Sequence, residues 1–270
     1  MRNPRAKLFV MLFAVAAAYP SLAVAQGHEG TIAYEFCDYD PWSFPVQCYV
    51  ALATVNVSSG FVIEDGVEPS LSSDGSRIAF SRYTQPGFDV VNLRDWSRTN
   101  VRSSGQSPAL SPDGGKIAFS EGGLLVMNAD GSNVVQLTMD WAGEPAWSAD
   151  GGTIAFDCQV ESGNYDICAI NADGTGFRRL TFDPASDYGA AYSPDGSTIA
   201  FTTTRYGQNS QIATMNINGT GVSPLGAGVE GFDPAWSPDS TRIAFTVTSC
   251  YQSGSCFDSI HLMNRDGSGE

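Results

Sequence analysis

Acidic residues recur directly before a proline in this 270-residue chain. Glu68, Glu144 and Asp233 each precede a Pro-Ser or Pro-Ala pair. Asp187 comes shortly before the related Ala-Ala pair at 190–191. Carboxylates gathered at one opening concentrate negative potential, which attracts a cation or a basic side chain. The four are therefore candidate binding residues. In the alternative interpretation, which the recurrence favours, they bond to backbone N–H groups of neighbouring elements.

Two aromatic and two basic side chains belong to the same candidate site. Trp141 and Tyr188 lie close to the acids in the sequence and would add apolar contact area for a partner. Arg82 and Arg205 each follow an Ile-Ala-Phe segment within four residues of its phenylalanine. A guanidinium there pairs either with the acids or with a ligand carboxylate. The periodic placement favours a structural ion pair.

Motifs of the common catalytic classes are absent from the sequence. It has no G-x-S-x-G elbow, no H-E-x-x-H pair and no phosphate loop. Its two histidines, His28 and His261, lie far apart in the sequence. We therefore predict a noncatalytic protein without a cofactor or a bound metal. Carboxylates alone can perform acid–base chemistry, so a hydrolase or lyase with a carboxylate or divalent-metal site at the same opening is the enzymatic alternative.

The elements that would position these residues come from an internal repeat. Ile-Ala-Phe starts at residues 78, 117, 154, 199 and 243, and Ile-Ala-Tyr starts at residue 32. The five Phe copies follow segments such as Pro-Ala-Trp-Ser-Pro-Asp, in which Pro and the next Gly or Ser favour a tight turn. Met-Asn-x-Asp-Gly and Leu-Thr follow in several repeats. Four strand-length runs in about 40 residues, repeated about six times, predict an all-β, six-bladed β-propeller of four-stranded blades.

The repeat also predicts the domain boundaries. We expect a signal peptide over residues 1–25 and one propeller domain over residues 26–270. The first repeat starts at Ile32 without a strand of the Pro-Ala-Trp type before it, and the last repeat ends just after its third strand. Both end blades are therefore expected to be incomplete, in a truncated or partly open ring. The expected blades lie near residues 26–63, 64–102, 103–138, 139–181, 182–225 and 226–270.

The repeat resembles that of a known family. Pro-Ala-Trp-Ser-Pro-Asp, then Ile-Ala-Phe, Met-Asn-x-Asp-Gly and Leu-Thr, is similar to the WD-like repeat of the TolB-like propeller family over residues 32–267. The resemblance implies a six-bladed, extracytoplasmic propeller whose funnel and loops bind partner proteins, with the Pro-Ala-Trp strand innermost. The sequence shows neither the α/β domain of TolB nor the hydrolase domain of related peptidases, so their roles are not transferred.

The implied strand order separates two faces of the ring. Tight turns lie on one face, and the loops between second and third strands lie on the other. Binding usually resides in such loops, because a rigid scaffold holds them. We predict a protein- or peptide-binding site on this loop-rich acidic face, with carbohydrate binding as a third alternative. The loops are expected at residues 82–88, 157–165, 203–210 and 248–257.

Six cysteines fall into three close pairs along the chain. An even number of cysteines behind a signal peptide indicates disulfides. Fifteen pairings are possible in principle, and the repeat register favours the three local ones. Each local bridge would staple one loop of the variable face. The expected pairs are Cys37 with Cys48, Cys158 with Cys168, and Cys250 with Cys256.

The N-terminus has the features of a cleaved signal peptide. Basic residues precede an apolar run at residues 8–18, and Ala23-Val24-Ala25 fits the cleavage pattern. Cleavage after Ala25 removes three basic residues and leaves 11 basic and 29 acidic ones, a formal charge of −18. Such a surface repels nucleic-acid phosphates and anionic lipids. We expect a periplasmic or secreted monomer that binds a protein or peptide of basic character, and neither nucleic acid nor the membrane interior.

Overall fold

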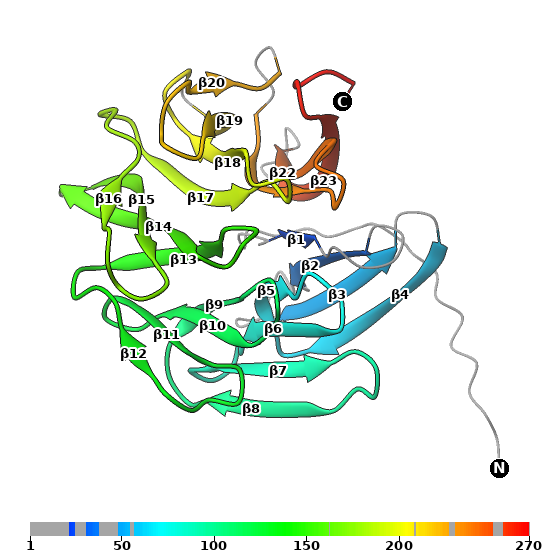
Figure 1. Cartoon of the computed structure of the whole chain (residues 1–270). Coiled ribbons are helices and arrows are strands. Elements are labelled where there is room, and N and C mark those ends of the chain that lie inside the picture. The colour runs from blue at the N-terminus through cyan, green and yellow to red at the C-terminus, as the bar shows by residue number, and fades with distance from the viewer. Residues whose placement is uncertain are drawn as a thin grey trace.

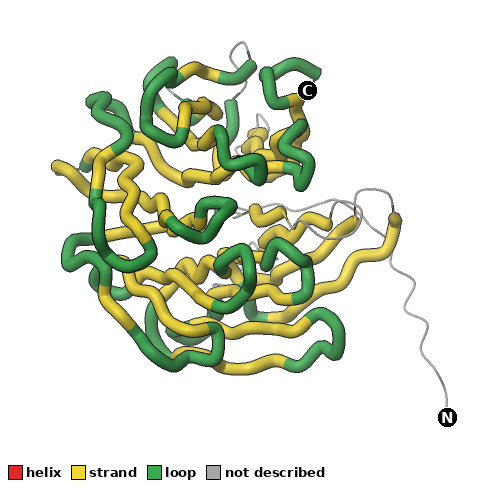
Figure 2. Tube along the Cα trace, in the orientation of Figure 1, coloured by secondary structure: helices red, strands yellow, loops and turns green. Residues whose placement is uncertain are grey.

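Short strands and tight turns make up the described chain. The computed structural model describes residues 22–24, 31–37, 48–54, 57–161, 163–207, 209–226, 230–250 and 256–269. Figure 2 shows that these residues form strands and loops. In this part of the chain no helix is long and apolar enough to cross a membrane.

Five sheets have four antiparallel strands each, paired in chain order. The first contains β1 (Leu22–Val24), β2 (Thr31–Cys37), β3 (Cys48–Thr54) and β4 (Val57–Glu64). The second contains β5 (Val67–Leu71), β6 (Arg77–Ser81), β7 (Phe88–Asn92) and β8 (Arg98–Arg102). The third contains β9 (Gln106–Leu110), β10 (Lys116–Ser120), β11 (Leu124–Asn128) and β12 (Val135–Gln136).

The remaining sheets continue the same order. The fourth contains β13 (Ala142–Trp147), β14 (Thr153–Glu161), β15 (Asn164–Asn171) and β16 (Arg178–Arg179). The fifth contains β17 (Asp187–Tyr192), β18 (Thr198–Thr203), β19 (Gln211–Asn216) and β20 (Ser223–Pro224). A three-stranded sheet follows, made of β21 (Phe232–Trp236), β22 (Arg242–Cys250) and β23 (Cys256–Asn264).

The sheets are arranged around a central axis as the blades of a propeller. The first strand of each sheet contacts the first strand of the next, from β5 through β9, β13 and β17 to β21. β1 contacts both β5 and β21, so it joins the two ends of the ring. Figure 1 shows β8, β12, β16 and β20 at the periphery and β1 nearer the centre. The predicted strand order within a blade is therefore the observed one.

Two expectations about the blades are wrong. The structure has five four-stranded blades and not six, because the sheet β21–β23 has three strands among the described residues. The first blade does have an inner strand, β1, which pairs with β2 through Leu22 opposite Tyr34 and Val24 opposite Ile32. That strand went unpredicted because its residues were assigned to the signal peptide. The expected cleavage site after Ala25 lies outside the described residues, and the signal peptide stays a prediction.

The hydrophobic core lies between neighbouring sheets. The Ile-Ala-Phe strand is second in each sheet and is buried on both faces, so Phe80, Phe119, Phe156, Phe201 and Phe245 are almost completely inaccessible. One core cluster joins residues of β6 and β7 to residues of β9, β10 and β11. Unbroken apolar runs are expected for strands packed on both sides. The repeat therefore buries each sheet against the next one.

The turn between the first two strands is held by its own side chains. In the second sheet the Gly75 N–H donates to the Ser72 carbonyl over 2.9 Å, and Gly75 has a φ of 64°. The Ser72 hydroxyl and the Ser76 N–H both donate to Asp74 Oδ1. These bonds lower the pKa of Asp74 to about 2, with the Ser72 bond contributing most. The Ser-x-Asp-Gly motif therefore specifies the turn locally.

Candidate functional site

A β-bulge interrupts each of the inner strands β5, β9, β13, β17 and β21. The bulge contains the residue that precedes Pro or Ala, and this residue has a positive φ in all five strands. Positive φ is uncommon outside glycine and is concentrated at functional sites, and a bulge re-aims a side chain locally. The residues are Glu68 (51°), Ser107 (50°), Glu144 (41°), Gly189 (63°) and Asp233 (53°).

A central cavity of about 280 Å³ runs along these inner strands. Its lining extends from the bulge residues to the turns at Ser73, Pro112, Ala149 and Pro194. Among the acids predicted from the sequence, three line this cavity: Glu68, Glu144 and Asp233. The fourth acid, Asp187, does not line it.

Glu144 and Asp233 approach each other on either side of Gly189. A Cβ placed on Gly189 would lie 3.3 Å from Glu144 Oε2 and 3.3 Å from Asp233 Oδ1. The Thr202 hydroxyl oxygen would lie 3.4 Å from the same point. Oxygen atoms from three successive sheets therefore crowd the position that a side chain of residue 189 would occupy.

Glu144 titrates near neutrality. Its side chain is exposed along the cavity, while protein atoms lie close around the carboxyl itself. The burial, and then the charge of Glu68, raise the pKa of Glu144 to about 7. A carboxyl with such a pKa is ionised in part at neutral pH and takes up or releases a proton easily. The cavity therefore holds a group whose charge depends on pH in the physiological range.

Asp157 is a fourth acid at this site that the sequence reasoning missed. It lies on β14, is 4% exposed, and its Oδ1 accepts the Gly189 N–H over 3.0 Å. Burial, followed by the charge of Glu144, raises its pKa well above the usual range, and Asp233 and Asp187 add to the effect. A signal for Asp157 was present in the repeat. The residue after Ile-Ala-Phe bears a hydroxyl in the other four copies, Ser81, Ser120, Thr202 and Thr246.

The residue after Ile-Ala-Phe joins neighbouring sheets at three of the bulges. The Ser81 hydroxyl accepts the Ser107 N–H over 3.0 Å, and the Thr202 hydroxyl accepts the Asp233 N–H over 3.0 Å. Asp157 makes the third contact, to Gly189. Each bond joins one sheet to the bulge of the next, so the bulges belong to the packing of the ring.

Glu68 takes part in one of these inter-sheet contacts. Its Oε2 accepts both the Ser81 hydroxyl and the Ser107 N–H over 2.7 Å. This is the structural role that the sequence analysis set against binding. Glu68 therefore differs from Glu144, which accepts no hydrogen bond from a residue that the structure describes.

Asp187 and Arg205 form a buried ion pair away from the cavity. Asp187 is fully inaccessible, and Arg205 Nε donates to its Oδ1 over 3.1 Å. The guanidinium also lies 6.0 Å from the centre of the Phe201 ring. These contacts are those of a structural ion pair. Ligand binding by Asp187 or Arg205 stays a prediction.

A groove of about 630 Å³ adjoins the cavity and contains Arg82 and Trp141. Glu68 lines both spaces. Arg82 Nη2 donates to the carbonyls of Pro86 (2.6 Å) and Arg102 (2.8 Å), so it holds the loop after β6. Trp141 is 44% exposed, and its ring lies 5.1 Å from that of Tyr165.

Tyr188 lies beside the acidic cluster without lining the cavity. Its hydroxyl shares a 2.7 Å hydrogen bond with the Ser210 hydroxyl. Burial raises the pKa of Tyr188, the Ser210 bond opposes the rise, and the charges of Asp233, Glu144 and Asp157 add to it. This response places Tyr188 within the electrostatic reach of the cluster.

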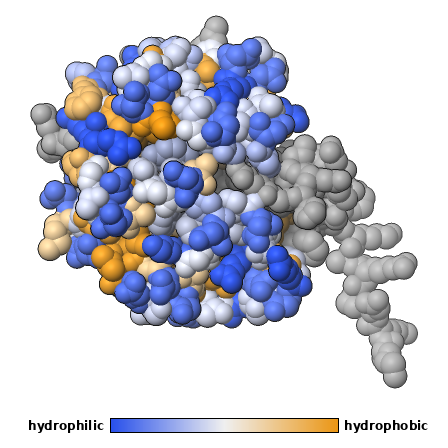
Figure 3. Space-filling view, in the orientation of Figure 1, coloured by the Kyte–Doolittle hydropathy of each residue, from blue (hydrophilic) through white to orange (hydrophobic). Residues whose placement is uncertain are grey.

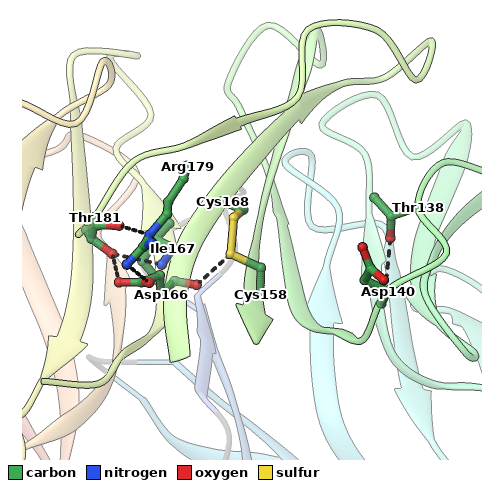
Figure 4. The surroundings of a disulfide bond; sticks show 8 residues. All are labelled: Thr138, Asp140, Cys158, Asp166, Ile167, Cys168, Arg179 and Thr181. Atoms are coloured by element: carbon green, nitrogen blue, oxygen red, sulfur yellow. Dashed lines mark hydrogen bonds and ion pairs between the residues drawn. A yellow bond between two sulfur atoms is a disulfide. The ribbon is translucent and has the colours of Figure 1, made fainter. Parts of the chain in front are cut away.

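One predicted disulfide is fully described. Cys158 on β14 and Cys168 on β15 are bonded, with their Cα atoms 5.8 Å apart (Figure 4). Cys48 is also in a disulfide, and Cys37 is its direct neighbour across β2 and β3.

The last cysteine pair has a matching backbone register. Cys250 lies opposite Cys256 on β22 and β23. The side chains of Cys37, Cys250 and Cys256 are outside the described residues, so two of the three predicted pairings stay predictions.

Two of the expected long loops are strand extensions instead. β14 continues to Glu161 and β15 begins at Asn164, and β22 and β23 likewise continue to Cys250 and from Cys256. The backbone ladder continues past the end of the repeat motif in both hairpins. Within the described ranges, no group of three or more His, Cys, Asp or Glu side chains is placed to hold a metal ion.

Comparison with known proteins places the chain in a family. The family model of the TolB beta propeller domain matches residues 58–269. The chain belongs to the TolB beta-propeller family. No curated protein matches its sequence.

Solved structures show the same fold at low sequence identity. A protein assigned as TolB from Agrobacterium tumefaciens is 20% identical, with a TM-score of 0.70 over 82% of this chain and 86% of that one. TolB from Acinetobacter baumannii is 18% identical, with a TM-score of 0.67 over 92% and 77%. An oligogalacturonate lyase in complex with manganese is 13% identical, with a TM-score of 0.60 over 88% and 72%. These likenesses show the propeller fold.

Proposed function

We propose that this TolB-family propeller is a noncatalytic binding scaffold outside the cytoplasm, whose loop-rich face and central cavity accept a protein or peptide of basic character. The observation that carries the proposal is the convergence of Glu68, Glu144 and Asp233 on one cavity. A narrow opening lined by charges of one sign focuses the field and attracts a group of the opposite sign. The excess of 29 acidic over 14 basic residues extends this field over the whole chain.

The surface and the disulfide support the same proposal. Hydrophilic residues dominate the face seen in Figure 3, and the hydrophobic residues there lie in small separate areas. A polar partner suits such a face better than an apolar one. The bond between Cys158 and Cys168 is typical of proteins that fold in an oxidising compartment, which supports a periplasmic or secreted location.

Partner capture with matched variants tests the proposal. The immobilised protein is incubated with the extracytoplasmic fraction of its source, and captured proteins are identified by mass spectrometry. We expect a defined partner whose capture falls about tenfold or more when Glu144→Ala and Asp233→Ala are combined, because two charges that face it are lost.

The control for this experiment is Ser107→Ala, at the equivalent bulge of the third sheet. It changes a cavity residue without changing charge, so capture should persist. Equal capture by the wild-type protein and the double variant would contradict the proposal.

One observation favours an enzymatic alternative. A carboxyl with a pKa of about 7 has the acid–base capacity that hydrolases and lyases need. A divalent ion at the cavity would then raise the melting temperature of the wild-type protein and not of Glu144→Gln. Melting curves with Mn²⁺ and with a chelator decide between the two functions, since the scaffold predicts no difference between them.

A further inference from the structure

The last sheet leaves the outer edge of its third strand uncovered. In each of the other five sheets a fourth strand pairs with the third, but within the described ranges β23 has no strand on its outer side. Proteins usually keep edge strands very short or place lysine or proline in them. β23 has nine residues without lysine or proline, whereas β12, β16 and β20 have two residues each. This edge is therefore open to pairing with a further strand.

Ile260 shows what a fourth strand covers in the other sheets. It lies opposite Thr246, the residue that follows Ile-Ala-Phe in this sheet. Its side chain is 39% exposed, whereas the residues at the same register in the third, fourth and fifth sheets are at most 1% exposed. These three residues are Leu124, Ile167 and Ile212. The apolar side chain of Ile260 is therefore accessible to an added strand.

A leucine at the fourth strand makes the covering contact in three sheets. Its N–H donates over 2.8 Å to the carbonyl of the covered residue, from Leu137 to Leu124, from Leu180 to Ile167 and from Leu225 to Ile212. The side chains of Leu180 and Leu225 belong to the core clusters between sheets. Since backbone groups alternate sides along an antiparallel strand, the same register directs the N–H and the carbonyl of Ile260 toward the open edge.

The existing fourth strands and the charge of the chain indicate the chemistry of the strand that would fit. In the fourth sheet the covering segment is Arg-Arg-Leu-Thr at residues 178–181, so basic residues are compatible with this place. The formal charge of −15 attracts a basic segment and repels a second copy of the chain. An extended basic segment from another protein therefore suits the edge better than a second copy does.

We infer that the outer edge of β23 binds an extended basic segment of another protein as a fourth strand, with an apolar side chain of that segment packed over Ile260. In such strand addition the main-chain hydrogen bonds supply affinity, and the contacts of alternate side chains supply specificity. The inference goes beyond the proposed function, because the residues that line the central cavity include none from β23.

A synthetic peptide from the chain itself serves as the probe. It has the sequence Arg-Arg-Leu-Thr-Phe of residues 178–182, capped at its amino terminus and labelled for fluorescence anisotropy. We expect it to bind the protein with a dissociation constant of about 1 mM or below. A matched peptide has proline in place of leucine and so lacks the N–H that would donate to the Ile260 carbonyl. It should bind about tenfold more weakly, and equal binding of the two peptides would overturn the inference.

Ile260→Lys and Ile217→Lys are a matched pair of protein variants. Both side chains are exposed, Ile260 by 39% and Ile217 by 43%, and each change adds one positive charge. A lysine on an edge strand opposes strand pairing, so Ile260→Lys should bind the peptide about tenfold more weakly than the wild-type protein. Ile217→Lys lies away from β23 in sequence and should bind within about twofold of the wild type. The same affinity in both variants would contradict the inference.

An extended chain tests the same edge without a separate peptide. The Asn264 N–H donates to the Ser268 carbonyl over 2.8 Å, as the Asn171 N–H does to the Thr175 carbonyl over 2.9 Å. Four residues added after Glu270 therefore match residues 178–181 in spacing. Added Arg-Arg-Leu-Thr should raise the melting temperature by about 4 °C or more and prevent peptide binding, whereas added Arg-Arg-Pro-Thr should do neither. An Arg-Arg-Leu-Thr extension that changes neither property would refute the inference.

Two further measurements separate this inference from the proposed function. The Glu144→Ala, Asp233→Ala double variant should bind the peptide within about twofold of the wild type, and loss of binding there would place the peptide at the cavity and overturn the inference. Sedimentation analysis should show a monomer. A dimer that the Arg-Arg-Leu-Thr extension abolishes would assign the edge to a second copy, which also overturns the inference and leaves the proposed function standing.

Discussion

Two groups of acidic side chains respond to their surroundings in opposite directions. Glu144 lines the cavity and Asp157 bonds to the neighbouring Gly189. Burial raises the pKa of both, with the charge of Glu68 adding to the effect on Glu144 and that of Glu144 adding to the effect on Asp157. Asp74 and Asp239 lie in the tight turns, where hydrogen bonds from serine and threonine lower their pKa values to about 2. The turn acids stay ionised in ordinary buffers, whereas Glu144 titrates near neutrality. The charge of the cavity therefore varies with pH while that of the turns does not.

This contrast predicts how stability depends on pH. The pKa of Glu144 is about 7 in the folded chain against an ordinary 4.5, so the folded state binds more protons between these values and stability falls as the pH rises through that window. The turn acids have depressed pKa values, so their contribution is lost as the pH falls below about 4. We predict maximum thermal stability near pH 5, measured by melting curves across the pH range.

Glu144→Gln isolates the part of this effect that belongs to the cavity. Without a titrating group at residue 144, the loss of stability between pH 5 and pH 8 should be smaller than in the wild-type protein. The loss below pH 4 should be unchanged, because the turn acids are untouched. A variant whose melting temperature declines as steeply as that of the wild type would show that other groups cause the decline.

Part of the candidate site could be predicted from the sequence, and the rest could not, for physical reasons. Glu68, Glu144 and Asp233 were found because each precedes a proline in the repeat, and all three line the cavity. The inter-sheet bonds of Glu68 could not be found, because they depend on how two sheets dock. Asp157 was visible as a carboxylate at a hydroxyl position of the repeat, but its meaning depends on the neighbouring Gly189 bulge.

At the scale of elements, a disulfide and an ion pair stabilise the β14–β15 hairpin. The Cys158–Cys168 bond links its two strands beside the buried carboxyl of Asp166. Asp166 pairs with Arg179 and accepts the Thr181 hydroxyl over 3.1 Å (Figure 4). Cys158 directly follows Asp157 in the strand, so the same hairpin holds one side of the acidic site.

Removal of the Cys158–Cys168 disulfide should destabilise the protein without preventing binding at the acidic site. A bond that closes a loop of about 10 residues contributes roughly 2–3 kcal/mol through the entropy of the unfolded chain. We expect the Cys158→Ala, Cys168→Ala double variant to lose about that much in urea unfolding. Partner capture should persist, since Asp157 keeps its backbone position in β14. An unchanged unfolding midpoint would show that the hairpin is held by its ladder and side-chain contacts alone.

Strand boundaries show where sequence motifs cease to be informative. The Ser-x-Asp-Gly turn marks the start of four of the five Ile-Ala-Phe strands, and Ser240 replaces the glycine before the fifth; residues of these types favour the turn backbone. No such signal marks the far end of the strand, so residues 157–165 and 248–257 were expected to be loops. The ladder from Gln159 opposite Tyr165 depends on pairing between strands, which residue types at single positions do not specify.

At the scale of the whole molecule, β1 lies where the two ends of the ring meet. Leu22–Val24 pairs with β2 and contacts both β5 and β21. The order of the sheets was predicted from the repeat, whereas this closure was not, because the segment reads as the end of a signal peptide. If cleavage occurs after Ala25, the mature chain lacks this strand and the inner edge of β2 loses its partner.

Two versions of the chain test the contribution of β1. Residues 21–270 contain the strand, and residues 26–270 correspond to the predicted mature protein. We expect the longer version to be more stable by about 2–3 kcal/mol, since a few net hydrogen bonds contribute roughly 1 kcal/mol each. The corresponding difference in melting temperature is about 4–10 °C. Equal melting temperatures would show that the ring does not need β1, and amino-terminal sequencing of the exported protein shows which version exists.

The hydrogen bonds between neighbouring sheets affect how a protein built from such repeats can diversify. The acceptor belongs to one repeat and the N–H to the next, as in Ser81 with Ser107 and Thr202 with Asp233. Duplication of a whole repeat therefore breaks old pairs and creates new ones, and serine, aspartate and threonine each serve as the acceptor at one of three bulges. Replacement of a hydroxyl by a carboxyl group, as at Asp157, keeps the bond and places a further acid next to a bulge residue. The seams between repeats are thus places where new ligand preferences can evolve without loss of the architecture.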